Sequence, residues 1–158
     1  MATERQYAFL KFLYEEENAR ENTINQYAKT LLSLITFYSG FVIFVADKML
    51  ATITLPMKVM FATTLASMLA AFATTVWGTR MADFEGVCDP EEACNELPAV
   101  DDDESENLFL RKGIADFTVA TTRNSGINNR RAKTLLVESY FLAAGILSHA
   151  VFFMIALF

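Results

Sequence analysis

Residues 59–79 read VMFATTLASMLAAFATTVWGT, a run of 21 residues without a charged side chain between Lys58 and Arg80. A helix that rises 1.5 Å per residue needs about 20 apolar residues to cross a bilayer core of about 30 Å. Two similar runs occur elsewhere, with 17 uncharged residues at 30–46 and 20 at 139–158. We therefore expect an all-α membrane protein with three transmembrane helices.

The rest of the composition argues against several other classes of protein. The net charge of -6 over 158 residues disfavours nucleic acid as a partner, because phosphates need a basic surface. The two cysteines, Cys88 and Cys94, are too few for a disulfide scaffold, and we expect free thiols. The sequence contains no glycine-rich phosphate loop and no zinc-binding motif. We therefore expect no cofactor, no metal site and no enzymatic activity.

The chain divides into four segments by charge and hydropathy. Residues 1–29 are charged with an aromatic face, which predicts a cytoplasmic amphipathic helix that runs into the membrane. This helix would lie along the inner leaflet or pack on the loop, and the alternative is that it docks a partner. Residues 30–79 predict a transmembrane hairpin, with Pro56 near the start of its second helix. Residues 80–133 predict a partly helical cytoplasmic loop, and residues 134–158 predict the third transmembrane helix.

The loop changes sign along its length. Residues 81–110 contain eleven acidic side chains and no lysine or arginine, which is typical of a solvated, weakly ordered segment. Residues 108–133 contain six cations against Asp116 alone, so we expect the two halves to form an intramolecular clasp. The Asn-Ser-Gly sequence at 124–126 predicts a break, after which the last helix would begin near Asn128.

A short internal repeat bears on the topology. Residues 25–32 read NQYAKTLL and residues 129–136 read NRRAKTLL, so six of eight positions agree. The repeat predicts that the first and third spans start at the same membrane face, either as two independent anchors or as matched residues around one vestibule. Eleven of the thirteen cations precede the first span or lie in the loop. By the positive-inside rule, we expect a multi-pass inner-membrane protein with a cytoplasmic amino terminus.

The second span has two adjacent rows of small side chains at spacings of four. Such rows let helices approach closely in lipid, where close packing supplies the energy of association. They fit packing within one copy, and they also fit a self-association or pore-lining face. The candidate oligomer interface consists of Ala62, Thr63, Ala66, Ser67, Ala70 and Ala71.

Two ionisable residues fall at the edge of the third span or inside it. Glu138 and His149 are eleven residues apart, which places them on one side of a helix about three turns from each other. Ionisable groups inside a membrane are costly and often functional. Hydrogen bonding across the bundle and a gating or ion-path role are the two alternatives.

The residues that lead into the first and third spans carry a resemblance. The sequence ENARENTINQYAKTLL at 17–32, a hairpin, a polar loop and NNRRAKTLL at 128–136 resemble small membrane effectors of bacterial anti-phage systems. The nearest are the Pycsar transmembrane effectors and the SLATT proteins. The resemblance implies a protein that disrupts the inner membrane once an infection signal arrives. We expect a homo-oligomer, because three helices of this length enclose no aqueous path alone.

Such a signal would act on the cytoplasmic loop, through a nucleotide second messenger or an upstream sensor protein. The candidate ligand-binding cations are Arg111, Lys112, Arg123, Arg130 and Arg131. Arginine pairs with phosphate through two parallel hydrogen bonds, which favours the arginines. The alternatives are a non-catalytic subunit of a membrane complex, an unregulated holin-like pore and a small transporter.

Overall fold

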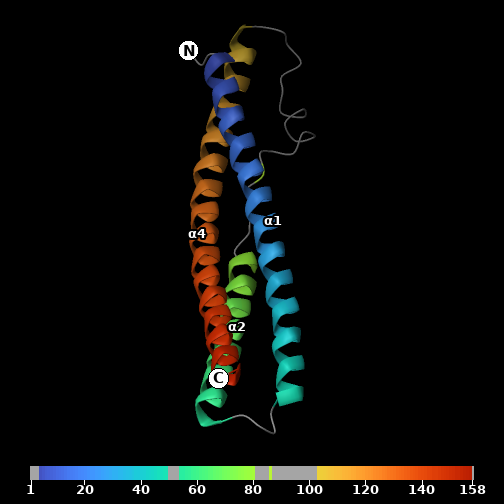
Figure 1. Cartoon of the computed structure of the whole chain (residues 1–158). Helices are drawn as coiled ribbons and strands as arrows, with labels where there is room; N and C mark the ends of the chain where they lie inside the picture. The colour runs from blue at the N-terminus through green and yellow to red at the C-terminus, as the bar shows by residue number, and fades with distance from the viewer. Residues whose placement is uncertain (1–3, 50–53, 81–85, 87–102, 158) are drawn as a thin grey trace. The chain divides into compact units, whose positions relative to one another are not determined.

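The computed structural model describes residues 4–49, 54–80, 86 and 103–157. These residues form α1 (Glu4–Met49), α2 (Leu55–Arg80) and α4 (Asp103–Leu157) and contain no strand (Figure 1). Each of the three helices includes a stretch long and apolar enough to cross a membrane. The chain is an all-α membrane protein with three spanning helices, as the sequence predicts.

The first helix is continuous from the charged segment into the first span. α1 has 46 residues, and the boundary expected between residues 29 and 30 is not a helix break. No glycine or proline occurs between residue 4 and Gly40, so no residue in this stretch disfavours the helix strongly. A helix of 46 residues is about 69 Å long, more than twice the bilayer core, and it therefore extends beyond the membrane.

The break expected at residues 124–126 is wrong. α4 is one helix of 55 residues that begins at Asp103 rather than near Asn128. Asn124 is completely buried, and Gly126 lies where a Cβ would meet no neighbouring atom within 4 Å. Packing of the buried face holds these residues helical, because tertiary contacts outweigh a propensity difference of about 1 kcal/mol or less per residue.

Both long helices bury a stripe of residues at spacings of three and four, which is the pattern of coiled-coil helices. On α1 the buried and half-buried positions run through Tyr7, Leu10, Tyr14, Glu17, Glu21, Ile24, Ala28, Leu31, Ile35, Tyr38, Val42 and Val45. On α4 the buried positions are Phe117, Ala120, Asn124, Asn128, Arg131, Leu135, Glu138, Leu142, Gly145, His149 and Phe152. We call each of these rows the seam of its helix.

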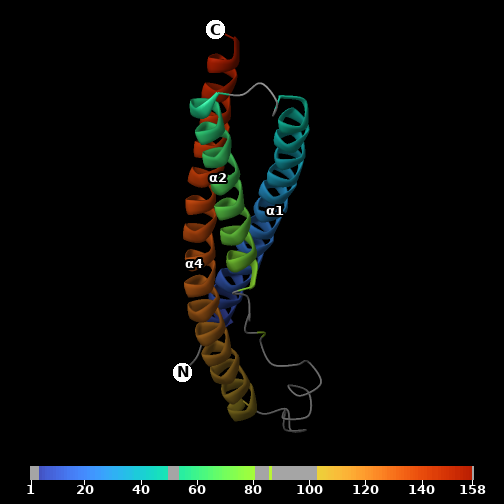
Figure 2. The ribbon, with the colours of Figure 1, turned by 90° about the horizontal axis from the view of Figure 1, so that it is seen from below.

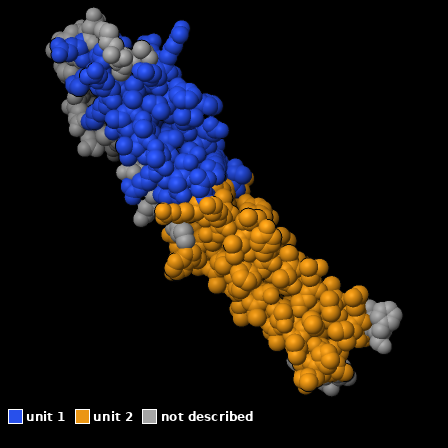
Figure 3. Space-filling model, turned by 90° about the vertical axis from the view of Figure 1, so that its left-hand side faces the viewer, with its two compact units in different colours: residues 1–23, 82–129 blue, residues 24–81, 130–158 orange. Residues whose placement is uncertain are grey.

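The chain divides into two compact units (Figure 3). Unit 1 comprises residues 1–23 and 82–129, and its described part pairs the first portion of α1 with the first portion of α4. Unit 2 comprises residues 24–81 and 130–158, and its described part is a bundle of α1, α2 and α4.

Within unit 2, α1 and α4 run in the same direction and α2 runs in the opposite direction (Figure 2). Two contacts fix the parallel direction, since Tyr27 meets Ser139 and, further along both helices, Tyr38 meets His149. The expectation that the first and third spans start at the same face is confirmed. Two apolar clusters fill the bundle, one around Leu31, Met68 and Leu142 and the other around Met57 and Phe152.

Candidate functional site

Buried polar side chains concentrate on the seam of α4. Unit 1 and unit 2 each contain such groups, and their hydrogen bonding differs. The buried polar residues of α4 are Asn124, Asn128, Arg131, Glu138 and His149. Each of them occupies a seam position, so the heptad spacing selects these residues for contact with other helices.

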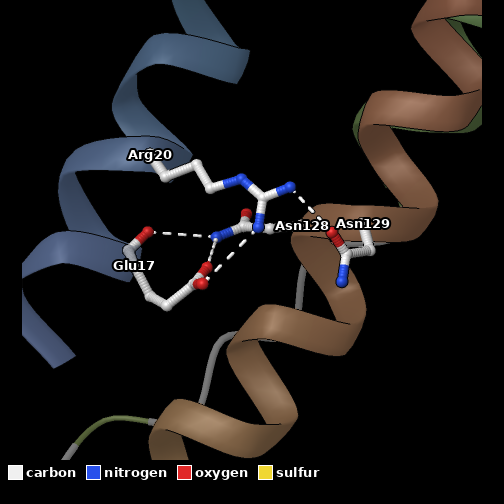
Figure 4. A network of polar contacts seen from close by, with 4 residues as sticks. All are labelled: Glu17, Arg20, Asn128 and Asn129. Atoms are coloured by element: carbon white, nitrogen blue, oxygen red, sulfur yellow. Dashed lines mark hydrogen bonds and ion pairs between the residues drawn. The ribbon is translucent and has the colours of Figure 1, made fainter. Parts of the chain in front are cut away.

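In unit 1, a polar network joins α1 to α4 (Figure 4). The amide nitrogen of Asn128 donates to the Glu17 backbone carbonyl at 3.0 Å and to Glu17 Oε2 at 2.8 Å. Arg20 donates to Asn129 Oδ1 at 2.7 Å and forms an ion pair with Glu17 at 3.5 Å. The bonds from Asn128 to Glu17 and from Arg20 to Asn129 fix the register of the two helices, because a shift by one residue would break these contacts between the helices.

Aromatic rings lie on the same helix pair in unit 1. Phe117 of α4 packs between two tyrosines of α1, with ring centroids 5.4 Å from Tyr7 and 5.5 Å from Tyr14. Gly113 lies directly beneath the Tyr7 ring, where a Cβ would come within 2.6 Å of Tyr7 Cε2. The aromatic face expected on the first segment is therefore a packing face against α4.

In unit 2, Arg131 is only 2% exposed and donates to the side-chain oxygen of Asn25. Asn25 is the first residue of the NQYAKTLL repeat, so the first copy of the repeat supplies a helix-to-helix contact. Lys29 and Lys133, which occupy equivalent repeat positions, are both exposed. Arg131 belongs to the bundle interior, whereas the candidate ligand Arg130 is exposed on the same helix.

The Glu138 carboxyl is completely buried in unit 2. The Thr75 side chain of α2 lies beside it, but the Thr75 hydroxyl donates to the carbonyl oxygen of Ala71 at 2.9 Å. Neither carboxyl oxygen has a hydrogen-bond partner among the described residues. A carboxyl in this position is costly as an unpaired anion.

His149 is 1% exposed, and its Nδ1 lies 2.7 Å from the hydroxyl of Tyr38 on α1. Four aromatic rings surround the imidazole, and Phe153 is the nearest with a centroid distance of 4.7 Å. Nε2 has no hydrogen-bond partner among the described residues. Glu138 and His149 are separated by eleven residues, about 16 Å along the helix, so they form two separate sites.

The structure separates the small residues of the second span into two groups. Ala62, Thr63 and Ala66 are exposed, and Ala70 is half-buried. Ala71 is completely buried in the apolar cluster of unit 2. Ser67 is half-buried and faces Gly145 of α4, because a Cβ on that glycine would lie 3.4 Å from the Ser67 Cβ. Part of the predicted interface therefore packs within one copy.

Three of the candidate cations lie in unit 1. Arg111, Lys112 and Arg123 are all exposed on α4. Lys112 and Arg123 are eleven residues apart, so they share one face of the helix. Cys88, Cys94 and eight of the eleven acidic residues at 81–110 lie outside the described residues, and the proposed clasp, which needs them, is not described.

Sequence reasoning missed the residues that make most of the polar contacts. Glu17, Tyr38 and Thr75 did not stand out by residue type, and Asn25 stood out only as the first residue of the repeat. The heptad spacing was the available signal, since it places Glu17 and Tyr38 on the α1 seam, which also carries the aliphatic residues Ile24, Leu31 and Ile35.

Fold and site together define a three-helix membrane protein whose spanning bundle contains buried ionisable groups. No group of three or more histidine, cysteine or acidic side chains placed to hold a metal occurs in the part of the chain that the structure describes. Comparison with protein-family models, curated proteins and solved structures gave no match.

Proposed function

We propose that the chain is an anti-phage membrane effector that self-associates in the inner membrane and makes it permeable to ions when an infection signal arrives. The observation that carries the proposal is the outer face of α2, where the small residues Ala62, Thr63 and Ala66 are exposed within a membrane span. Small side chains on a lipid-facing helix allow a second helix to approach closely.

The packed interior of the single three-helix bundle also favours self-association. The apolar clusters around Met68 and Phe152 occupy the interior of the three-helix bundle. A path for ions therefore requires several copies, with the path between them. In this proposal the partners are the lipid bilayer and further copies of the chain, and the chain is not an enzyme.

The helices themselves offer a route for the signal. α1 and α4 each contribute residues to both units, so a change in the pairing of unit 1 has a direct covalent connection to the spanning bundle. We place the amino terminus and unit 1 in the cytoplasm on the charge asymmetry of the sequence. The cations Arg111, Lys112 and Arg123 then face the compartment in which a nucleotide messenger would appear.

The test is depolarisation of bacterial cells that express the chain, measured with a potential-sensitive dye. Ala66→Leu adds bulk to the proposed interface, and overpacking by about 1.4 kcal/mol lowers association about tenfold. The matched control is Ala143→Leu, which makes the same change at an exposed position of α4. We expect depolarisation by the parent and by Ala143→Leu, and a strong reduction with Ala66→Leu.

Two results would count against the proposal. Equal depolarisation by Ala66→Leu and the parent would remove α2 from the interface. An inserted parent protein that leaves the potential unchanged would favour a subunit that is inert without its partners.

A further inference from the structure

The Glu138 carboxyl has an environment that differs from that of a structural buried acid. Structural buried acids are paired with a cation or accept several hydrogen bonds. Glu138 has neither among the described residues, although it is completely buried. A buried carboxyl without a hydrogen-bond partner among the described residues indicates that it binds a small ligand or a proton.

α2 and α4 pack closely before and after this buried carboxyl along the helix axis. One turn before Glu138, a Cβ on Gly78 of α2 would lie 3.1 Å from Thr134 Cγ2. Two turns after Glu138, a Cβ on Gly145 would lie 2.5 Å from Met68 Cε. The two glycines permit this approach of α2 and α4 on both sides of the carboxyl along the helix axis.

The Thr75 hydroxyl beside Glu138 is placed to act as a hydrogen-bond acceptor. The Thr75 hydroxyl uses its only hydrogen on the Ala71 carbonyl, which leaves its oxygen lone pairs for Glu138. A carboxylate offers lone pairs as well, so the two groups would repel each other. A carboxylic acid offers an O–H, which the Thr75 oxygen accepts.

Charged groups do not offset the burial. α1 carries no Asp, Glu, Lys, Arg or His between Thr30 and Ala46, and α2 carries none between Val59 and Thr79. Before Glu138 on α4 lie Arg131, which bonds Asn25, and Lys133, which is exposed. Tyr140 of α4 is exposed, and Tyr27 of α1 bonds Ser139. On the other side along α4 lies His149, which bonds Tyr38.

We propose that Glu138 is a proton-binding site in the spanning bundle, which holds a neutral carboxylic acid whose O–H is donated to Thr75 Oγ1. When the proton is lost, the lone pairs of the Glu138 carboxylate face those of Thr75 Oγ1. Their repulsion loosens the contact between α2 and α4. A metal cation fits less well, because among the described residues no group of three or more histidine, cysteine or acidic side chains could hold one, and hard cations take six or more oxygens. The inference is independent of the proposed function.

Infrared spectroscopy of the full chain in lipid vesicles tests the proposal, because a carboxylic acid C=O absorbs apart from a carboxylate. We expect a carboxylic acid band at neutral pH that disappears on titration to alkaline pH. Glu138→Gln should remove the band and keep the fold, because its amide also donates to Thr75. The control Glu106→Gln removes an exposed carboxyl from the same helix and should leave the band unchanged.

A second variant keeps the proposal testable if Glu138→Gln fails to insert. Thr75→Val removes the acceptor, so the acid band should persist and move to higher frequency. A parent chain without an acid band at neutral pH would overturn the proposal, as would an equal band in Glu138→Gln. A band that Thr75→Val leaves at the same frequency would overturn the assigned hydrogen bond.

Discussion

Unit 1 and unit 2 are built from the same two helices and continue the same heptad spacing, yet their polar seam residues behave differently. In unit 1, Asn128 bonds Glu17 twice and Arg20 bonds Asn129. In unit 2, both oxygens of Glu138 and Nε2 of His149 lack a partner among the described residues. Asn128 Oδ1 and Thr121 Oγ1 of unit 1 also lack a partner there, but only in unit 2 does this concern both oxygens of a buried carboxyl.

The largest loss of stability is expected when a bulky side chain is introduced between α2 and α4 in unit 2. Gly145→Leu would force a side chain against Met68 and Ser67, and overpacking of this kind costs about 1–3 kcal/mol. We expect a lower unfolding midpoint in detergent. Gly126→Leu is the control, because a Cβ there meets no neighbour within 4 Å. Equal midpoints for both variants would mean that α2 and α4 do not pack here.

The next effect concerns the network of unit 1. Asn128→Ala removes two contacts and leaves Glu17 without them, which we expect to cost about 1–3 kcal/mol. The adjacent residue is a matched control, since Asn129 is exposed and Asn129→Ala should cost less than about 1 kcal/mol. Thermal unfolding of the two variants decides the point. A larger loss of stability for Asn129→Ala than for Asn128→Ala would contradict this prediction, because Asn129 rather than Asn128 would then fix the helix register.

A smaller effect is expected for the hydrogen bond inside the spanning bundle. Tyr38→Phe removes the hydroxyl that meets His149 Nδ1 at 2.7 Å. Hydrogen bonds between membrane helices contribute about 0.6 kcal/mol on average, and we expect a loss of that size. Tyr140→Phe at an exposed position of α4 should change nothing. A loss of several kcal/mol would instead assign His149 a dominant structural role.

The smallest effect on stability, and a large effect on signalling, is expected at the exposed cations of unit 1. Lys112→Gln with Arg123→Gln should change stability by less than about 0.5 kcal/mol, because exposed substitutions rarely do more. If the loop reads an anionic signal, depolarisation triggered by the upstream defence genes should be lost. Depolarisation that persists at the parental level would show that this face of α4 does not bind the signal. Arg131 is unsuitable for the test, because its bond to Asn25 lies inside unit 2.

The long apolar runs were sufficient to predict three spanning helices, because span length depends only on composition and the thickness of the bilayer. The NQYAKTLL and NRRAKTLL repeat likewise predicted that the first and third spans run in parallel. The continuity of α4 through residues 124–126 was not predictable from local propensity, since packing of Asn124 outweighs it. The environment of Glu138 depends on Thr75 and Gly78, which belong to another helix and are far away in sequence.

The central claim is that several copies of this chain open a path through the membrane, and reconstitution into lipid vesicles tests it most directly. Purified chain would be inserted at increasing protein-to-lipid ratios, and the decay of a potassium diffusion potential would be recorded. We predict a leak that rises more steeply than the protein ratio, because assembly depends on concentration, and that is reduced with Ala66→Leu but not with Ala143→Leu. Inserted protein that produces no leak above protein-free vesicles at any ratio would contradict the account.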